Sequence, residues 1–340
     1  MHKTRTSQEP RTGHPAMRHF IGAAVFYILN IVLSPVTLLG YVIWTGSLLS
    51  NRSSGVSATA QGPLSARWLA HNLGTRKDES ANQLMRVLPG VPPLGPRWVA
   101  GPLMLAHRLT GCVPKAFRYP FEGDVPPQYQ AAARMTFFDA VVDQSLSVME
   151  QFVVLGAGFD TRAFRLPKHM AIQAFEVDAP KTQAVKCEMV KKAGIDVAQV
   201  TFVAADFEKE DWLDLLVVAG FDTNKPALFL WEGVTMYLER NAVEDTLRKI
   251  ASTAKGSVVT FDYLTTEPLT SPSLYWRYAR AGTKAGGEPV KFGIDSTPPV
   301  HERLTELLQS CGLLLGEHHM LGQETEGKRA WGGFATAVVM

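Results

Sequence analysis

The pattern of apolar and polar positions differs between the two parts of this chain. From about Gln128 onward, short apolar runs are separated by amphipathic segments, which predicts a parallel β-sheet with helices on both faces. A helix is expected around Ala131–Val148. The strands predicted after it are Phe152–Leu155, Ile172–Val177, Val200–Ala204, Ala227–Trp231 and Ser257–Tyr263, followed by the apolar runs LLLGEHH and GGFATAVVM near the end. The pattern therefore predicts an α/β fold.

The amino-terminal part carries one long apolar segment. No charged residue occurs from Phe20 through Asn51, and about 20 apolar residues are enough to cross a bilayer as one helix. Pro35, in the middle of the segment, bends or breaks a helix. Two arrangements fit these facts, namely a single tilted span and two short helical arms that dip into one leaflet with both ends on the cytoplasmic side. Basic residues flank the segment on both sides, so the positive-inside rule does not choose between them.

Between this segment and the alternating region, the residue composition changes several times. SSGVSATAQG is expected to be a linker of small residues, and GPLSARWLAHNLG a helix. The stretch PGVPPLGPRWVAGP, residues 89–102, contains too many prolines for a regular element to be expected. With the residues after it, this stretch is interpreted as a second membrane-touching surface, a cap over a site, or plain packing.

These patterns predict a domain organisation. It comprises a basic tail (1–19), a membrane segment (20–51), a linker with a helical cap (52–127) and an α/β domain (128–340). Residues 264–300 of that domain are rich in Pro, Thr, Gly and aromatic residues, and do not resemble a single helix. Insertions of this kind often shape a binding pocket.

Composition and charge exclude several classes of protein. The 340 residues carry a formal net charge of +2, which gives no electrostatic argument for a nucleic-acid partner. The 3 cysteines are scattered, and no HExxH motif is present, so neither a disulfide framework nor a catalytic metal is expected. The pair His318 and His319 is interpreted as part of a strand, whose adjacent side chains point to opposite faces.

Four successive strand ends carry glycine or an acid. Gly156 and Gly158 follow the first strand, Asp178 follows the second, Asp206 follows the third and Glu232 follows the fourth. Ligands of open α/β sheets bind outside the carboxyl ends of the strands. We therefore expect these positions to open on one crevice.

The residue types at these ends indicate the ligand. Gly-Ala-Gly alone is no more than a tight turn, but Asp178, about 20 residues further on, suits a ribose held by its hydroxyl groups. Asp206 then lies where it would accept a hydrogen bond from an adenine amino group. NAD(P) and S-adenosylmethionine both carry adenosine. The dinucleotide fingerprint has a third glycine where this chain has Thr161, and a crevice lined by acids suits the cationic S-adenosylmethionine better.

In several motifs taken together, the chain resembles the leucine carboxyl methyltransferase-like family. VVLGAGFDTRAFRL, FEVDAPKTQAVK, VTFVAADFEKEDW and FLWEGVTMYLERNAV are similar in order and spacing to that family's microbial S-adenosylmethionine-dependent O-methyltransferases. The resemblance covers roughly residue 56 to the end of the chain. It implies a Rossmann-like class I methyltransferase fold, with a seven-stranded, mostly parallel sheet that ends in an antiparallel hairpin.

The resemblance also implies roles for individual residues. Arg134 would pair with the cofactor's carboxylate, Gly156 and Gly158 would line its methionine portion, and Asp178 would bind the ribose. Asp206 and Phe207 would bracket the adenine, and Glu232 would face the cofactor's amino group. Where related proteins often have a second basic residue in the lead-in helix, this chain has Thr136.

Structural roles are the alternative for several of these residues. Asp160 and Arg162 would then cap a helix after the turn, Glu176 would be a structural acid, and Arg134 would be a surface residue of an amphipathic helix. The aromatic residues Trp231 and Tyr237 fit the core as well as a pocket wall.

The function predicted from these observations is S-adenosylmethionine-dependent O-methyl transfer by a membrane-associated enzyme whose catalytic domain is cytoplasmic. The acceptor is expected to be a carboxylate or hydroxyl group of a small lipophilic molecule, with a protein carboxyl terminus as the alternative. No general base stands out, which favours a carboxylate. A nicotinamide-dependent oxidoreductase and a non-catalytic cofactor-binding membrane protein are the rival classes.

Overall fold

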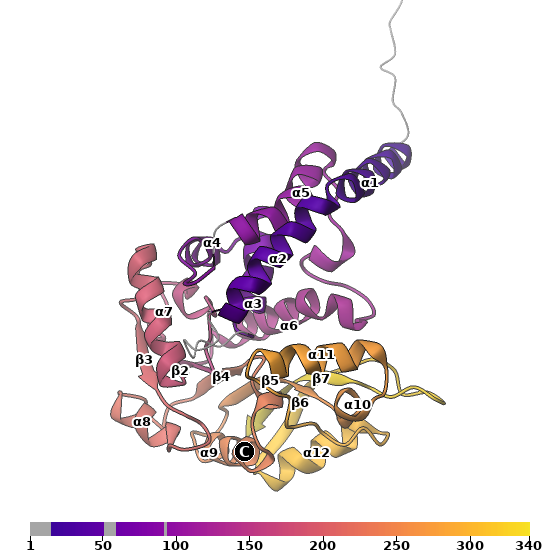
Figure 1. The fold of residues 1–340 in the computed structure, drawn as a ribbon. Helices are drawn as coiled ribbons and strands as arrows, with labels where there is room; N and C mark the ends of the chain where they lie inside the picture. Colours follow the sequence, from indigo (N-terminus) through magenta and orange to yellow (C-terminus); the bar gives the residue numbers. More distant parts are fainter. Residues whose placement is uncertain (1–14, 51–58, 92–93) are drawn as a thin grey trace, which may run out of the picture. The chain divides into compact units, whose positions relative to one another are not determined.

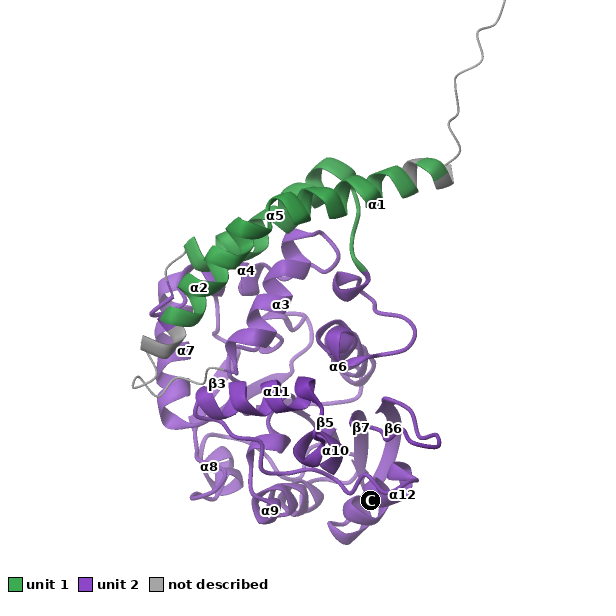
Figure 2. Cartoon of the chain, turned by 45° about the vertical axis from the view of Figure 1, so that its right-hand side comes forward, with its two compact units in different colours: residues 1–46, 92–114 green, residues 47–91, 115–340 purple. Residues whose placement is uncertain are grey.

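The computed structural model describes residues 15–50, 59–91 and 94–340. Contacts divide the chain into two compact units, shown in green and purple in Figure 2. Unit 1 comprises Met1–Gly46 and Pro92–Pro114, and unit 2 comprises Ser47–Val91 and Lys115–Met340. The predicted segment 52–127 is thus divided between the two units. Most of the predicted basic tail and of the predicted linker lies outside the described residues.

Unit 1 is helical. It contains α1 (Pro15–Val32), most of α2 (Ser34–Ser50) and α5 (Leu94–Thr110). The expectation of an irregular structure is wrong over 94–102, because α5 includes both Pro96 and Pro102, whereas 89–91 form neither helix nor strand. Pro96 lies in the first turn, where a backbone N–H has no partner within the helix. Pro102 lies further in and is buried, so packing outweighs the local cost of a proline.

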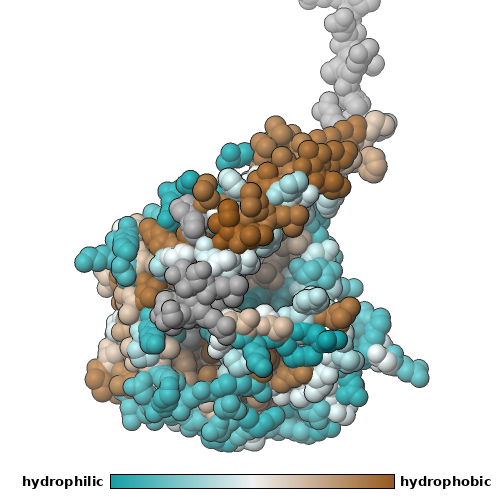
Figure 3. All heavy atoms as spheres, viewed as in Figure 1, coloured by the Kyte–Doolittle hydropathy of each residue, from teal (hydrophilic) through white to brown (hydrophobic). Residues whose placement is uncertain are grey.

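Small residues let the helices of unit 1 approach closely. α1 packs along α5, and a Cβ atom on Gly40 of α2 would lie 2.7 Å from the backbone nitrogen of Val99 in α5. Elsewhere α1 and α2 expose apolar side chains, which gather into the brown surface over these helices in Figure 3. The exposed residues on the two helices include Phe20, Ile21, Val25, Ile28, Ile31, Val32, Leu38 and Val42.

No single helix in the described part of the chain is long and apolar enough to cross a membrane. Phe20–Val32 and Ser34–Ser47 meet the criterion of length and composition only as a pair, and that pair is bent by 55°. The bend lies at the position where Pro35 predicts an interruption.

Unit 2 is built on a seven-stranded sheet of order β3-β2-β1-β4-β5-β7-β6 (Figure 1). The first five strands are parallel and β7 is antiparallel to both β5 and β6, which confirms the predicted fold class. The strands are β1 (Gln151–Leu155), β2 (Gln173–Asp178), β3 (Val200–Ala204), β4 (Ala227–Trp231), β5 (Val258–Leu264), β6 (Leu313–Leu321) and β7 (Gly332–Val339). β1 and β4 are buried along their whole length, as central parallel strands covered on both faces are.

Helices cover both faces of this sheet. Side chains of α6 (Gln130–Ser145) pack with Phe152, Val154 and Leu230 on one face. On the other face, α8 (Trp212–Val218), α9 (Arg240–Ala251) and α12 (Val300–Ser310) pack with Val153, Leu155 and Phe229. Unit 2 also contains α3 (Gln61–Asn72), α4 (Glu79–Arg86) and α7 (Pro180–Ala193).

The segment 264–300 is not a single helix, as predicted. It holds α10 (Thr266–Thr270) and α11 (Leu274–Ala285), followed by chain that forms no further helix or strand before α12. After β1, by contrast, the structural alternative for Asp160 and Arg162 requires a helix that these residues would cap. The structure has only one 3₁₀ turn there, η4 (Ala163–Arg165), so this expectation is wrong.

Candidate functional site

The seven residues predicted to form a site line one cavity of about 270 Å³. They come from α6 and from the carboxyl ends of four strands, which neighbour one another in the order β3-β2-β1-β4. These residues are Arg134, Gly156, Gly158, Asp178, Asp206, Phe207 and Glu232. Below, this cavity is called the crevice. Its position is where open α/β sheets bind ligands.

The glycine turn after β1 packs so closely against neighbouring residues that no side chain fits on it. Gly156 has φ +63°, and a Cβ atom there would lie 2.4 Å from Cγ2 of Val234. Gly158 has φ +45°, and its Cβ would lie 3.0 Å from that of Ala60. Both positions therefore require glycine for conformation and for space.

Asp178 is fixed at the end of β2. Its Oδ2 accepts a hydrogen bond from the backbone N–H of Gly158 at 2.5 Å, and Oδ1 accepts one from Ala179 at 2.6 Å. Burial raises the pKa of this carboxyl to about 6, and the two N–H donors only partly offset that effect. A carboxylate at this place can accept the hydroxyl groups of a ribose.

Asp206 and Phe207 follow β3 at the mouth of the crevice. Asp206 accepts a hydrogen bond from the backbone N–H of Glu208 at 3.0 Å and forms an ion pair with Lys209 at 2.5 Å. The hydrogen bond from Lys209 keeps the pKa of Asp206 below its ordinary value. The ring of Phe207 packs on Trp212 with 6.1 Å between centroids, so it offers a fixed apolar surface beside the acid.

Glu232, at the end of β4, is held by two buried arginines. Its Oε2 lies 2.6 Å from Nη1 of Arg162 and 3.0 Å from Nη2 of Arg67. Both guanidinium groups also contact Oδ2 of Asp160, at 2.5 and 2.6 Å. Burial raises the pKa of Glu232, but Arg162 and Arg67 more than compensate, and the net shift is downward. Glu232 is therefore ionised, and its charge is already balanced.

The same ion network continues beneath the turn. Arg162 Nε lies 2.7 Å from Asp139, which also pairs with Arg76, and Arg76 in turn contacts Asp78. All of these side chains are buried. Alternating charges of this kind rigidify the crevice wall, because removing one member leaves its neighbours buried without a partner. Asp160 and Arg162 belong to this network and do not cap a helix.

Arg134 reaches the crevice from α6. Its Nη2 lies 2.6 Å from Oδ2 of Asp262, which is 1% exposed and lies on β5. Asp262 Oδ1 accepts a hydrogen bond from the backbone N–H of Gly233 at 2.6 Å. Arg134 is thus not a surface residue of an amphipathic helix, because its guanidinium points inward to a buried acid.

Glu176 has the structural role suggested as its alternative. It is fully buried and pairs with Lys186 of α7 at 2.6 Å, and it does not line the crevice. Burial raises its pKa to about 7, an effect that Lys186 opposes.

The remaining aromatic and polar candidates divide between core and crevice. Trp231 is fully buried in the core, whereas Tyr237 lines the crevice. The hydroxyl group of Thr136 donates to the carbonyl of Ala132 and accepts from the N–H of Phe121, so it does not face the crevice. His318 and His319 lie in β6, where His318 contacts Tyr263 and His319 contacts Phe137. Within the described ranges, no group of three His, Cys, Asp or Glu residues is placed to hold a metal ion.

Sequence reasoning missed several residues of the site. Arg67 lies in a helix that was recognised, but nothing in its local pattern indicates that it reaches Glu232. Asp262 does leave a signal, because it is an acid inside the apolar strand SVVTFDY. Glu288 accepts hydrogen bonds from the N–H and hydroxyl groups of Thr59 at 3.0 and 2.7 Å, and these two residues line the crevice together.

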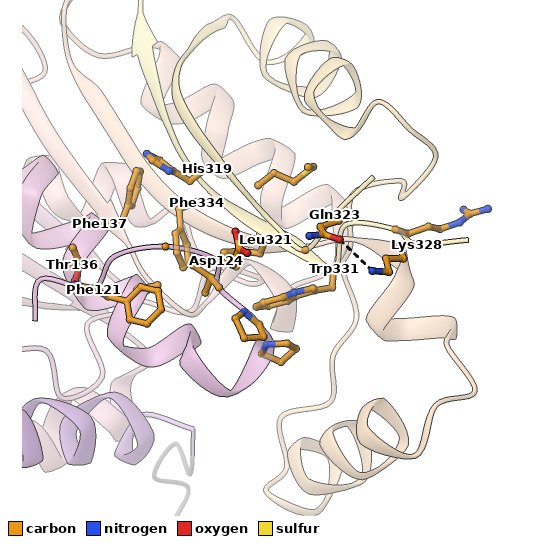
Figure 4. A pocket seen from close by; sticks show the side chains of 18 of the residues that line it. Phe121, Asp124, Thr136, Phe137, His319, Leu321, Gln323, Lys328, Trp331 and Phe334 are labelled. Carbon is orange, nitrogen blue, oxygen red and sulfur yellow. Dashed lines mark hydrogen bonds between the residues drawn. The ribbon is translucent and has the colours of Figure 1, made fainter. Parts of the chain in front are cut away.

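A larger groove of about 990 Å³ contains none of the seven residues (Figure 4). Its walls include Phe121, Phe137, Trp331 and Phe334, and the labelled side chains point toward a common space between α6 and the β6–β7 hairpin. The smaller crevice is the better candidate for chemistry, because strand ends, buried charges and glycine turns converge there.

Known proteins resemble this chain over the part that contains the predicted site residues. The leucine carboxyl methyltransferase family matches residues 124–251. A Bacillus subtilis protein that carries the name of an S-adenosyl-L-methionine-dependent methyltransferase is 32% identical over 222 residues, which are 63% of this chain and 70% of that protein. A similarly named protein of Mycobacterium sp. (strain KMS) is 30% identical over 209 residues, 61% of this chain and 62% of its own length.

Among solved structures, the magnesium protoporphyrin IX methyltransferase of Synechocystis with bound SAH covers 65% of this chain and 91% of its own. The TM-score is 0.40 and the identity 12%.

Proposed function

This chain belongs to the leucine carboxyl methyltransferase family of S-adenosylmethionine-dependent methyltransferases, and we propose that it methylates an oxygen atom of a small lipophilic molecule, most readily a carboxylate. The observation that supports the assignment to this crevice is that all seven residues expected to contact the cofactor line it.

The residues present fit S-adenosylmethionine. Gly156 and Gly158 form a tight turn that lines the crevice with backbone alone, and Asp178 stands at the adjacent strand end with both oxygens oriented by backbone N–H groups. Arg134 offers a guanidinium group for a carboxylate, and Asp206 and Phe207 offer an acceptor and an apolar face for adenine. When bound, the cofactor supplies a methyl group that is already activated by its sulfonium.

The chain's own contribution is positioning and exclusion of water. The ion network around Glu232 fixes the crevice wall, and Glu288 and Thr59, which are hydrogen-bonded to each other, line it as well. Methyl transfer in such a site depends on alignment of the reacting atoms. No histidine is among the described residues that line the crevice, and an ionised carboxylate needs no general base. This supports a carboxylate acceptor over an alcohol.

We further propose that α1 and α2 contact a lipid bilayer, with unit 2 on the cytoplasmic side. The exposed apolar side chains on these helices and the absence of charge from Phe20 through Asn51 support membrane contact. A membrane location also favours acceptors that partition into lipid. Glycosylation acceptor sites added at each flank, translated with microsomes, test the topology, since modification of only one flank rules out the hairpin and leaves the bent span.

Labelled methyl transfer tests the reaction. Full-length protein and its Asp178→Ala variant are incubated with S-adenosyl-L-[methyl-³H]methionine and a cell extract, which is then separated into lipid, aqueous and protein fractions. We expect label in the lipid fraction, released as volatile methanol by mild base, because methyl esters hydrolyse and methyl ethers do not. Base-stable label excludes a methyl ester and therefore a carboxylate acceptor, and base-labile label confined to protein identifies a protein carboxylate. Equal incorporation by the variant, or none by the wild type, contradicts the proposal.

A further inference from the structure

Asp262 connects two walls of the crevice without lining it. Its side chain is buried on β5, where Oδ1 accepts the N–H of Gly233 from the loop after β4 and Oδ2 pairs with Arg134 from α6. The backbone carbonyl of Asp262 also accepts the hydroxyl of Thr235 at 2.6 Å. One residue therefore sets the position of both the guanidinium group and the loop that carries Glu232.

Arg134 has little else to hold it. In the described part of the chain, Asp262 is its one ion-pair partner, and its buried Nε has no hydrogen-bond partner. Nη1 lies 3.5 Å from the position that a Cβ atom of Gly233 would take. The buried arginines Arg67 and Arg162 differ, because each is held by two or more acids.

We propose that Asp262 is a positioning residue that aims Arg134 at the carboxylate of the cofactor's methionine portion. The inference rests on the proposed function, since it requires S-adenosylmethionine in the crevice. A long arginine side chain with one anchoring acid presents its remaining N–H groups in a fixed direction, and a carboxylate is the group that this planar fork binds best. Without the acid, the guanidinium group has no fixed orientation.

The alternative is a purely structural role, in which Asp262 only stabilises the loop after β4. Asp262→Asn separates the two roles, because an amide oxygen still accepts the N–H of Gly233 while the charge that holds Arg134 is removed. The matched ligands are S-adenosylhomocysteine, which has the amino-acid portion, and 5′-methylthioadenosine, which lacks it. Both contain the adenosine that Asp178 and Asp206 are expected to bind.

Calorimetry on the full-length protein measures the dissociation constants. We expect Asp262→Asn to weaken S-adenosylhomocysteine at least tenfold and to leave 5′-methylthioadenosine within twofold of the wild type. In an Arg134→Gln background, adding Asp262→Asn should weaken S-adenosylhomocysteine no further, because the residue it acts through is gone. Equal weakening of both ligands, or an additive effect in the double variant, overturns the proposal.

Arg134→Lys provides a second route if Asp262→Asn does not fold. It keeps the charge beside Asp262 but loses the planar fork, and we expect the same selective loss of S-adenosylhomocysteine. An unchanged affinity for this ligand contradicts the inference. Failure of the proposed function looks different, because the wild type then binds neither ligand.

Discussion

Val234 packs directly against Gly156, so closely that a Cβ atom on the glycine would lie 2.4 Å from Cγ2 of the valine. The turn after β1 and the loop after β4 thus meet with no space for a side chain. Because Gly156 also has a positive φ, two independent physical reasons require glycine at this position.

Gly156→Ala should therefore destabilise the protein and impair ligand binding. We expect a loss of about 1–3 kcal/mol in the free energy of unfolding and at least tenfold weaker S-adenosylhomocysteine binding. Gly194→Ala is the matched control, since Gly194 has φ +66° but nothing within 4 Å of its would-be Cβ. It should cost about 1 kcal/mol and leave binding unchanged. Urea unfolding and calorimetry measure both, and unaltered binding by Gly156→Ala would refute the assignment.

Binding of S-adenosylhomocysteine should depend on pH through Asp178. Burial raises the pKa of this carboxyl to about 6, and the ionised form is the one that accepts ribose hydroxyl groups. Affinity should rise with pH up to about 6 and then level off, so that at pH 5 it is about tenfold weaker than at pH 8. Asp178→Asn should bind weakly at every pH and lose this step. A flat wild-type profile from pH 5 to 7 would contradict the expected role.

The buried pair of Glu176 and Lys186 predicts a strong asymmetry between variants. Lys186→Met alone should destabilise the protein by about 3–5 kcal/mol at pH 8, because it leaves a buried carboxylate unpaired. Glu176→Gln combined with Lys186→Met should recover most of that loss.

The pH dependence of the single variant has a definite sign. The pKa of Glu176 is already raised to about 7 by burial, and without Lys186 it rises further above its unfolded value. The unfolded state then releases a proton that the folded state retains, so stability should fall as pH rises from 5 to 8. Urea midpoints at the two pH values check this, and a midpoint that rises with pH would exclude it.

Recognition of adenine predicts discrimination between two purine ligands. If Asp206 accepts a hydrogen bond from the adenine amino group, the wild type should bind S-adenosylhomocysteine about tenfold better than S-inosylhomocysteine, which lacks that donor. Asp206→Ala should reduce this preference. Asp196→Ala is a suitable control, because Asp196 also pairs with a lysine, Lys168 at 2.8 Å, but lies outside the crevice. If Asp206→Ala prefers S-adenosylhomocysteine as strongly as the wild type does, this residue does not recognise adenine.

Local pattern predicted the sheet well, because each strand carries its own signal. Val200–Ala204 and Ala227–Trp231 match β3 and β4 residue for residue. The crevice followed from the same reasoning, since the ends of adjacent parallel strands must meet. Asp262 and Arg134 could not be paired in this way, because the contact depends on how α6 packs over β5. The helix α5 was missed because its prolines gave a misleading local signal. Packing within unit 1 outweighs the tendency of proline to interrupt a helix.

The order in which the chain visits its two units limits how the protein can be shortened. Residues 47–91 belong to unit 2, but the next stretch, 92–114, returns to unit 1 before the chain enters unit 2 for good. A fragment starting at Ser47 would retain α5 and lose α1 and most of α2, leaving the part of α5 around Gly95 and Val99 bare to water and prone to self-association. Crystallisation of unit 2 alone therefore calls for deleting 92–114 as well and joining Val91 to Lys115 through a short polar tether.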